Sequence, residues 1–165
     1  MVRVYVAGAS NDREMLRGVM DDLEKGGIEI THDWTGCEAR EMTIAEAAEC
    51  ARKDIKGVVN ARVVLAFLTR NEYAYRGTRH EIGAALAMKA KGHPIDVWVV
   101  NNAGDPHELG RDALPTCMQC CFEYAADRFF TSRDEAVREL IAFHNQCSPK
   151  PLGIWCLRDV LDATC

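Results

Sequence analysis

Four short runs of apolar, mostly β-branched residues alternate with stretches of helical periodicity, and this alternation constrains the fold more than any other feature. The apolar runs cover residues 2–7, 28–34, 63–68 and 95–100. Apolar side chains at helical spacing predict helices between them, over residues 12–25, 43–58 and 78–91. Strands that alternate with helices favour a parallel sheet with helices on both faces. The pattern therefore predicts an α/β fold.

The last third of the chain has a weaker pattern. It predicts a loop, a fifth strand at one of two places, a helix and a short final helix, over residues 101–116, 122–124 or 128–130, 132–144 and 157–161. A length of 165 residues fits one domain with a sizeable core. We therefore predict a single domain over residues 1–165: a doubly wound, flavodoxin- or Rossmann-like fold of three layers with a mostly parallel sheet of about five strands.

Composition argues against several classes of partner. The net charge of -5 offers no basic face for a nucleic-acid polymer, and no apolar run is long enough to span a membrane. The N-terminus has the pattern of a first strand and not of a signal peptide, so we expect the cytoplasm and reduced cysteines.

The chain holds eight cysteines, and one group of them has a spacing that a metal site could use. Cys117 and Cys120, with His144 and Cys147, could supply four zinc ligands. The pairs lack the short turns of a zinc ribbon, and buried thiols that act as small apolar side chains are the commoner outcome. We expect no metal and no cofactor.

Candidate binding residues follow the first three predicted strands. In parallel sheets of this kind, ligands bind beyond the carboxyl ends of the strands. Backbone N–H groups at the start of a helix favour an anion there, and glycine lets a ligand approach the backbone. An aromatic ring can stack on a base. The candidates are Gly8, Ser10, Asn11, Asp33, Trp34, Tyr75, Arg76, Gly77 and Arg79.

Glu81 is the principal candidate for chemistry, and its spacing leaves two roles open. A carboxylate at the start of a helix beyond a strand end can attack a sugar carbon, as in retaining glycosidases. The stretch 78–81 also has the spacing of a capping box, in which the glutamate binds the N-cap amide. The same spacing recurs at 43–46 and 132–135 and, more loosely, at 11–14. On spacing alone, the cap is the commoner role.

Three stretches together resemble the nucleoside 2-deoxyribosyltransferase-like superfamily, which includes 2′-deoxynucleoside 5′-phosphate N-hydrolases. They are Val4-Tyr5-Val6-Ala7-Gly8, Asp54 followed by the strand 63–67, and the stretch 77–86, which is similar to the family's Gly-x-x-x-Glu-x-Gly-x-Ala helix start. The resemblance covers residues 4–100. It implies that Glu81 is a nucleophile, that Asp54 is the acid near the leaving base, that Tyr5 positions Glu81, and that Gly8 lines the pocket.

The resemblance also implies a reaction and an assembly. It implies cleavage of an N-glycosidic bond in a nucleoside or nucleoside 5′-monophosphate, with water or a second base as acceptor, by a homodimer or larger homo-oligomer. Tyr75 stands where family members carry Asp or Ser, and Arg62 stands where an Asp is frequent. Arg76, Arg79 and the turn 10–11 could hold a phosphate. The alternatives are a non-catalytic nucleotide-binding or sensing domain, and an NAD-cleaving glycohydrolase.

Overall fold

The computed structural model describes residues 1–37, 42–70, 73–109, 118 and 120–147. Five parallel strands form one sheet in the order β2-β1-β3-β4-β5. They are β1 (Arg3–Ala7), β2 (Glu29–Ile30), β3 (Val63–Phe67), β4 (Asp96–Val100) and β5 (Arg128–Phe130). This confirms the predicted α/β class. In this order the chain adds β2 on one side of β1 and the later strands on the other, so ligands are expected beyond the carboxyl ends of β1 and β3.

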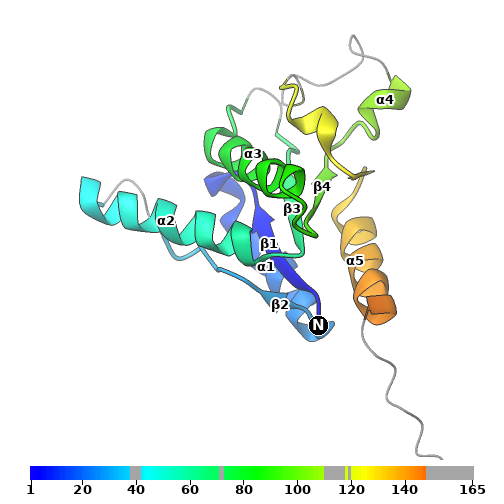
Figure 1. Ribbon diagram of the computed structural model, residues 1–165, viewed down its shortest axis with the longest axis horizontal. Helices are drawn as coiled ribbons and strands as arrows, with labels where there is room; N and C mark the ends of the chain where they lie inside the picture. Colours follow the sequence, from blue (N-terminus) through cyan, green and yellow to red (C-terminus); the bar gives the residue numbers. More distant parts are fainter. Residues whose placement is uncertain (38–41, 71–72, 110–117, 119, 148–165) are drawn as a thin grey trace, which may run out of the picture.

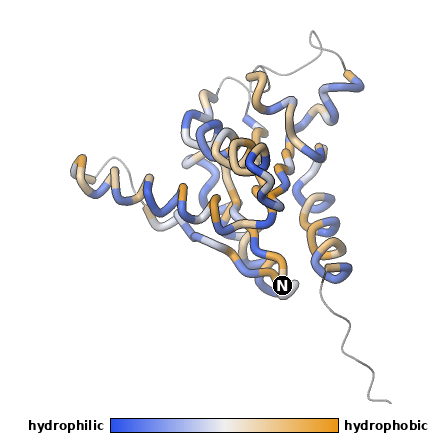
Figure 2. Tube along the Cα trace, in the orientation of Figure 1, coloured by the Kyte–Doolittle hydropathy of each residue, from blue (hydrophilic) through white to orange (hydrophobic). Residues whose placement is uncertain are grey.

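Two layers of helices cover the sheet (Figure 1). Helices α1 (Arg13–Lys25) and α5 (Arg133–Cys147) contact each other, and α2 (Ile44–Asn60) contacts α3 (Arg76–Ala90). Alternate residues of β1 face the two layers, because Val4 and Val6 join the apolar cluster of α1 and α5 whereas Tyr5 joins that of α2 and α3. Hydrophobic residues gather along the central strands (Figure 2). Tyr5 therefore points toward the layer that carries Asp54 and Glu81.

The strand predicted over 28–34 is shorter in the structure, where β2 covers only Glu29–Ile30. The cause is Trp34, whose indole Nε1 donates to the carbonyl of Val6 at 2.7 Å. An indole N–H thus occupies the edge of β1 where a longer β2 would have donated a backbone N–H. The chain turns away at this point, and Cys37 N donates to the Trp34 carbonyl at 2.9 Å in the turn that follows.

The weakly patterned third contains two features that differ from expectation. The short helix α4 (Pro106–Leu109) lies in the stretch predicted as loop. Of the two places proposed for the fifth strand, 128–130 forms β5, and Glu123–Ala125 forms a 3-10 helix, η4. The helix expected near 157–161 lies outside the described residues. In the described part of the chain, no helix has the length and apolar character needed to span a membrane.

Helix α3 begins two residues earlier than predicted, and this removes the capping role considered for Glu81. Its N-cap is Tyr75, in the left-handed conformation with φ 43°, so Glu81 is in the second turn. The hydroxyl of Thr78, expected to cap the helix, instead donates to the Gly8 carbonyl at 3.1 Å. The capping box predicted for Thr43 and Glu46 is confirmed.

The two other proposed caps are incomplete. The N-cap of α1 is Asp12, which makes no side-chain cap hydrogen bond, so the looser pattern at 11–14 does not form a capping box. Ser132 Oγ accepts from Glu135 N at 3.3 Å, but the Glu135 carboxylate accepts from Thr131 N at 3.4 Å and not from Ser132. Only half of that capping box is present.

Candidate active site

Tyr5 and Glu81 form the centre of the site. The Tyr5 hydroxyl donates to Glu81 Oε1 at 2.7 Å, and the Tyr5 side chain is fully buried in β1. Burial raises the pKa of Glu81 to about 7, with a smaller contribution from the charge of Asp54, whereas the hydrogen bond from Tyr5 opposes the rise. The pKa of Tyr5 is raised by burial and by the two carboxylates, so Tyr5 stays protonated and remains a donor.

Asp54 lies beside this pair, on α2. Burial raises the pKa of Asp54, and its interactions with the Tyr5 hydroxyl and with His32 oppose the rise. His32 Nε2 lies 3.5 Å from Asp54 Oδ1, with both side chains largely buried. His32 follows β2, and no spacing along the chain pairs it with a residue of α2. The charge of Asp54 in turn contributes to the raised pKa of Glu81, so the two carboxyl groups are electrostatically linked.

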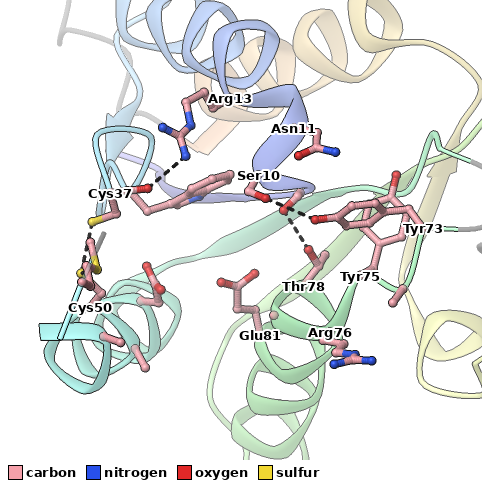
Figure 3. A pocket seen from close by; sticks show the side chains of 18 residues that line it. Ser10, Asn11, Arg13, Cys37, Cys50, Tyr73, Tyr75, Arg76, Thr78 and Glu81 are labelled. Carbon is pink, nitrogen blue, oxygen red and sulfur yellow. Dashed lines mark hydrogen bonds between the residues drawn. The ribbon is translucent and has the colours of Figure 1, made fainter. Parts of the chain in front are cut away.

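A cavity of about 780 Å³ opens beside Glu81 at the carboxyl ends of β1 and β3 (Figure 3). Nine of the expected residues line it: Gly8, Ser10, Asn11, Trp34, Asp54, Tyr75, Arg76, Gly77 and Glu81. The lining also includes residues that the sequence argument did not select, namely Arg13, Cys37, Met42, Ala47, Cys50, Ala51, Tyr73, Ala74 and Thr78. Most of the second group come from α2 and from the segments beside it, whose position depends on tertiary packing.

Three expected site residues do not line the cavity. Tyr5 is buried in the sheet and reaches the site through its hydrogen bond with Glu81. Asp33 turns toward other partners: its Oδ1 accepts from Thr35 N at 2.9 Å and its Oδ2 accepts from Arg17 at 2.6 Å. Both interactions hold the Asp33 carboxylate away from the cavity.

Arg79 also points elsewhere. Its Nε donates to Glu123 Oε1 at 2.9 Å, and its guanidinium donates to the Ala74 carbonyl at 2.7 Å. Glu123 is fully buried, and a buried carboxylate requires a cationic or hydrogen-bonding partner. Arg79 therefore serves the packing of α3 against η4 and is not placed to hold a phosphate in the cavity.

The tyrosine at position 75 is buried and already hydrogen-bonded. Its hydroxyl accepts from Arg70 N at 2.7 Å, and its ring packs edge-on against Tyr73 at a centroid distance of 4.8 Å. Tyr73 in turn lies within 3.3 Å of Ser10, hydroxyl to hydroxyl. These contacts connect the loop after β3 to the loop after β1. Tyr75 thus shapes one wall of the cavity.

Gly57 allows α2 to approach the site closely. A Cβ atom at this position would lie 2.8 Å from His32 Cβ and 2.8 Å from the Tyr5 ring. Because Gly57 lies one turn after Asp54, the close approach of the helix places the Asp54 carboxyl beside the Tyr5 hydroxyl. The close packing of α2 at Gly57 therefore determines where the Asp54 carboxyl group lies.

Replacing Gly57 with Ala is expected to lower the free energy of unfolding by about 1–3 kcal/mol, because the new methyl group overlaps Tyr5 and His32. Urea unfolding monitored by circular dichroism measures the change. Gly83→Ala is the matched control: Gly83 is in α3, and its added Cβ would meet nothing within 4 Å. There, alanine is expected to stabilise the helix by up to about 1 kcal/mol. Equal effects of the two substitutions would contradict the close packing.

The pKa of Glu81 predicts how stability depends on pH. The group binds its proton more tightly in the native state, so its stabilising contribution is complete below the ordinary pKa of 4.5 and is lost as the pH rises through about 7. The loss is on the order of 3 kcal/mol across this window. Urea unfolding at about pH 5 and about pH 8 is the measurement, and the Glu81→Gln variant is expected to lose this part of the pH dependence. Identical pH dependence in variant and wild type would rule out the raised pKa.

The described residues contain no group of three or more His, Cys, Asp or Glu side chains that could hold a metal ion. Cys117, proposed above as a ligand together with Cys120, lies outside the described residues. Of the other proposed ligands, Cys120 is half-buried and Cys147 is exposed at the end of α5. His144 accepts a hydrogen bond from Val2 N at 3.2 Å through Nδ1.

Comparisons with known proteins give a likeness in structure but not in sequence. No protein-family model matches this chain. No curated protein matches it. Among solved structures, the chain is similar to a CMP N-glycosidase from Clostridium botulinum, BcmB, with 15% sequence identity, a TM-score of 0.49, and coverage of 86% of this chain and 98% of that chain. The function of the present chain is therefore inferred from its own residues.

Proposed function

We propose that this protein cleaves the N-glycosidic bond of a nucleoside or nucleoside 5′-monophosphate, with Glu81 as the nucleophile. The observation that carries the proposal is the hydrogen bond of Tyr5 to Glu81, which lines, together with Asp54, a cavity where this sheet topology places ligands. A half-buried carboxylate that accepts from a buried hydroxyl, with a second carboxyl group lining the same cavity, supplies the two kinds of group that retaining glycosidases use.

The reaction has two steps. First, Glu81 attacks the anomeric carbon, an ester bond forms, and the C–N bond breaks with its electron pair going to the base, which takes a proton from Asp54. Second, water attacks the same carbon, its proton returns to Asp54, and the ester bond breaks to release Glu81 as carboxylate. If a second base replaces water, the product is a new nucleoside. The first step leaves both carboxyl groups without a proton, and the second step restores the proton to Asp54.

The electrostatics of the cluster act on both proposed roles. The raised pKa of Asp54 favours the protonated form that a leaving base needs. The hydrogen bond from Tyr5 favours the ionised form of Glu81 that a nucleophile needs. The interaction with His32, whose Nε2 lies 3.5 Å from Asp54 Oδ1, opposes the rise in the pKa of Asp54. Burial still leaves the pKa of Glu81 raised to about 7, so in this proposal the nucleophile becomes fully ionised only above neutral pH.

Cationic groups at the cavity support a nucleotide over a free nucleoside. Arg13 and Arg76 line it on different sides, and α3 begins at Arg76, so the start of this helix also lies at the cavity. Arg13 already donates to the Cys37 carbonyl at 3.1 Å, which fixes the guanidinium at the cavity edge. A 5′-phosphate at this edge would leave the sugar near Glu81. In this proposal Arg76 takes the phosphate role that the sequence also suggested for Arg79.

The second candidate is a non-catalytic nucleotide-binding domain. Tyr75 favours it, because its side chain is buried and its hydroxyl already accepts from Arg70 N. Tyr75 therefore has less capacity to hydrogen-bond a sugar than the Asp or Ser expected at this position. The two candidates predict the same cavity and differ in whether a ligand is cleaved. An assay of bond cleavage therefore distinguishes the two candidate functions, whereas an assay of binding does not.

The experiment is incubation of the purified protein with a panel of nucleosides, nucleoside 5′-monophosphates and NAD, with free base measured by liquid chromatography. We expect base release from at least one nucleoside monophosphate. Release of nicotinamide from NAD alone would favour a glycohydrolase of that substrate. If no base is released and nucleotides raise the Tm, the protein binds without cleaving, and the catalytic proposal fails.

We also propose that the protein is a homo-oligomer that pairs through α2. Ile44, Ile55 and Val59 on this helix are 92%, 41% and 44% exposed, and they recur at helical spacing. A row of exposed apolar side chains on one helix is typical of a surface that another chain covers. Sedimentation velocity at micromolar concentration is expected to give a dimer or larger species. A monomer at these concentrations would contradict the proposal.

A further inference from the structure

Two thiols touch at the edge of the cavity. The Sγ atoms of Cys37 and Cys50 are 3.2 Å apart, which is closer than ordinary van der Waals contact between sulfurs (Figure 3). Both side chains are half-buried, and both line the cavity. Met42 adds a third sulfur, with its Sδ 3.8 Å from Cys50 Sγ. Neither cysteine takes part in the proposed reaction.

The two cysteines belong to different walls. Cys37 lies in the turn after β2, where its N–H donates to the Trp34 carbonyl and its own carbonyl accepts from Arg13. Cys50 lies on α2, one turn before Asp54. Of the whole helix, only Gly57 and Val58 near its C-terminal end are buried. The contact between the thiols therefore connects the N-terminal half of α2 to the turn that carries Trp34.

We propose that Cys37 and Cys50 are a redox pair that forms a reversible disulfide across the cavity wall. A small disulfide such as oxidised glutathione reaches the pair through the cavity. One cysteine thiolate attacks a glutathione sulfur and releases one glutathione thiolate. The second cysteine, after losing its proton, attacks the mixed disulfide and releases the other. The pair loses two electrons and two protons, and one glutathione disulfide becomes two glutathione thiols.

The geometry favours a disulfide over a metal site. Among the described residues, no third His, Cys, Asp or Glu joins the two cysteines in a group that could hold an ion. The pKa of Cys37 is raised by its hydrogen bond with Cys50 and by burial, which disfavours the thiolate that a metal would need. For the same reason, we expect the rate of disulfide formation to rise with pH above neutrality.

The test uses the full-length protein, reduced, desalted and then incubated with oxidised glutathione. Trypsin cleavage after Lys25, Arg40 and Arg52 gives the peptides 26–40 and 41–52, each with one cysteine. We expect these two peptides to be joined in a non-reducing digest, with a mass about 2 Da below their sum, and to separate after reduction. Joining is expected to raise the Tm by about 5 °C, because a loop of the unfolded chain is closed.

Variants make the result specific. Cys147→Ser removes an exposed cysteine on α5, outside the cavity lining, and is expected to form the joined peptides and show the Tm rise like the wild type. Cys37→Ser and Cys50→Ser are each expected to lose both effects. The proposal is overturned if oxidised glutathione leaves Cys37 and Cys50 unjoined in the wild type, either as free thiols or as separate mixed disulfides with glutathione.

Discussion

Replacing Glu81 with Gln is expected to lower kcat for base release by at least about a thousandfold, with little change in KM. Gln has the same size as Glu but a neutral amide that cannot form the ester intermediate. The hydrogen bond from Tyr5 to the side-chain oxygen is retained, so the cavity keeps its shape. Initial rates with the best substrate of the nucleotide panel give the measurement.

Two controls distinguish a loss of the chemical step from a loss of folding or of substrate binding. Glu49→Gln changes an exposed glutamate of α2 that pairs with Arg52, and it is expected to leave the rate unchanged. The Glu81→Gln variant should still show a nucleotide-dependent rise in Tm, because the residues proposed to bind the phosphate are intact. Full base release by Glu81→Gln would show that Glu81 is not the nucleophile.

The second large effect is expected from Asp54→Asn, which should lower the rate by about a hundred- to ten-thousandfold, the range of general acid–base catalysis. Asn cannot give a proton to the departing base. The loss should be smaller for a substrate whose leaving group needs no proton, such as a nucleoside of an N7-methylated purine. Rates with matched methylated and unmethylated substrates make this comparison. An equal loss with both would contradict the acid role.

The pH profile of Asp54→Asn provides an independent readout. The charge of Asp54 contributes to the raised pKa of Glu81, so its removal lowers that pKa. The acidic limb of the rate profile, which reports ionisation of the nucleophile, is expected to move to lower pH. The basic limb, which reports loss of the acid's proton, is expected to disappear. A variant with both limbs unchanged would exclude coupling between the two carboxyl groups.

The strands of this fold are predictable from sequence because each is short, apolar and bounded by polar turns. The predicted runs 63–68 and 95–100 agree with β3 and β4 to within one residue at each end. The run 28–34 does not, because a tertiary hydrogen bond from Trp34 to Val6 ends the pairing of β2 with β1. A local pattern contains no information about such a contact.

The start of α3 illustrates a second limit. The residues from Thr78 to Glu81 match a capping box, but Tyr75 adopts a left-handed conformation and begins the helix earlier. A non-glycine residue rarely takes this conformation unless its surroundings require it. Burial of the Tyr75 ring and its hydrogen bond with Arg70 N supply that requirement. The local spacing therefore suggested a capping role for Glu81, which the packing of Tyr75 rules out.

The residues of the candidate site were also only partly predictable from the sequence. Tyr5, Asp54 and Glu81 meet in the structure. Spacing alone singles out none of the three, and they were predicted together from the order of three stretches along the chain. The cavity excludes Asp33 and Arg79 because each pairs with a residue far along the chain, Arg17 in one case and Glu123 in the other. The proximity of His32 to Asp54 likewise depends on the approach of α2 at Gly57, which no spacing indicates.

A trapped glycosyl-enzyme tests the central claim most directly. A substrate analogue with fluorine at the 2′ position slows the second step, so the ester should accumulate. Acid quenching, digestion with pepsin at low pH and tandem mass spectrometry then locate the added sugar. We predict that the sugar is attached to Glu81, which is the only acidic residue between His80 and Lys89. A sugar attached to any other residue, or base release from the analogue without a covalent adduct, would contradict the assignment of Glu81 as nucleophile.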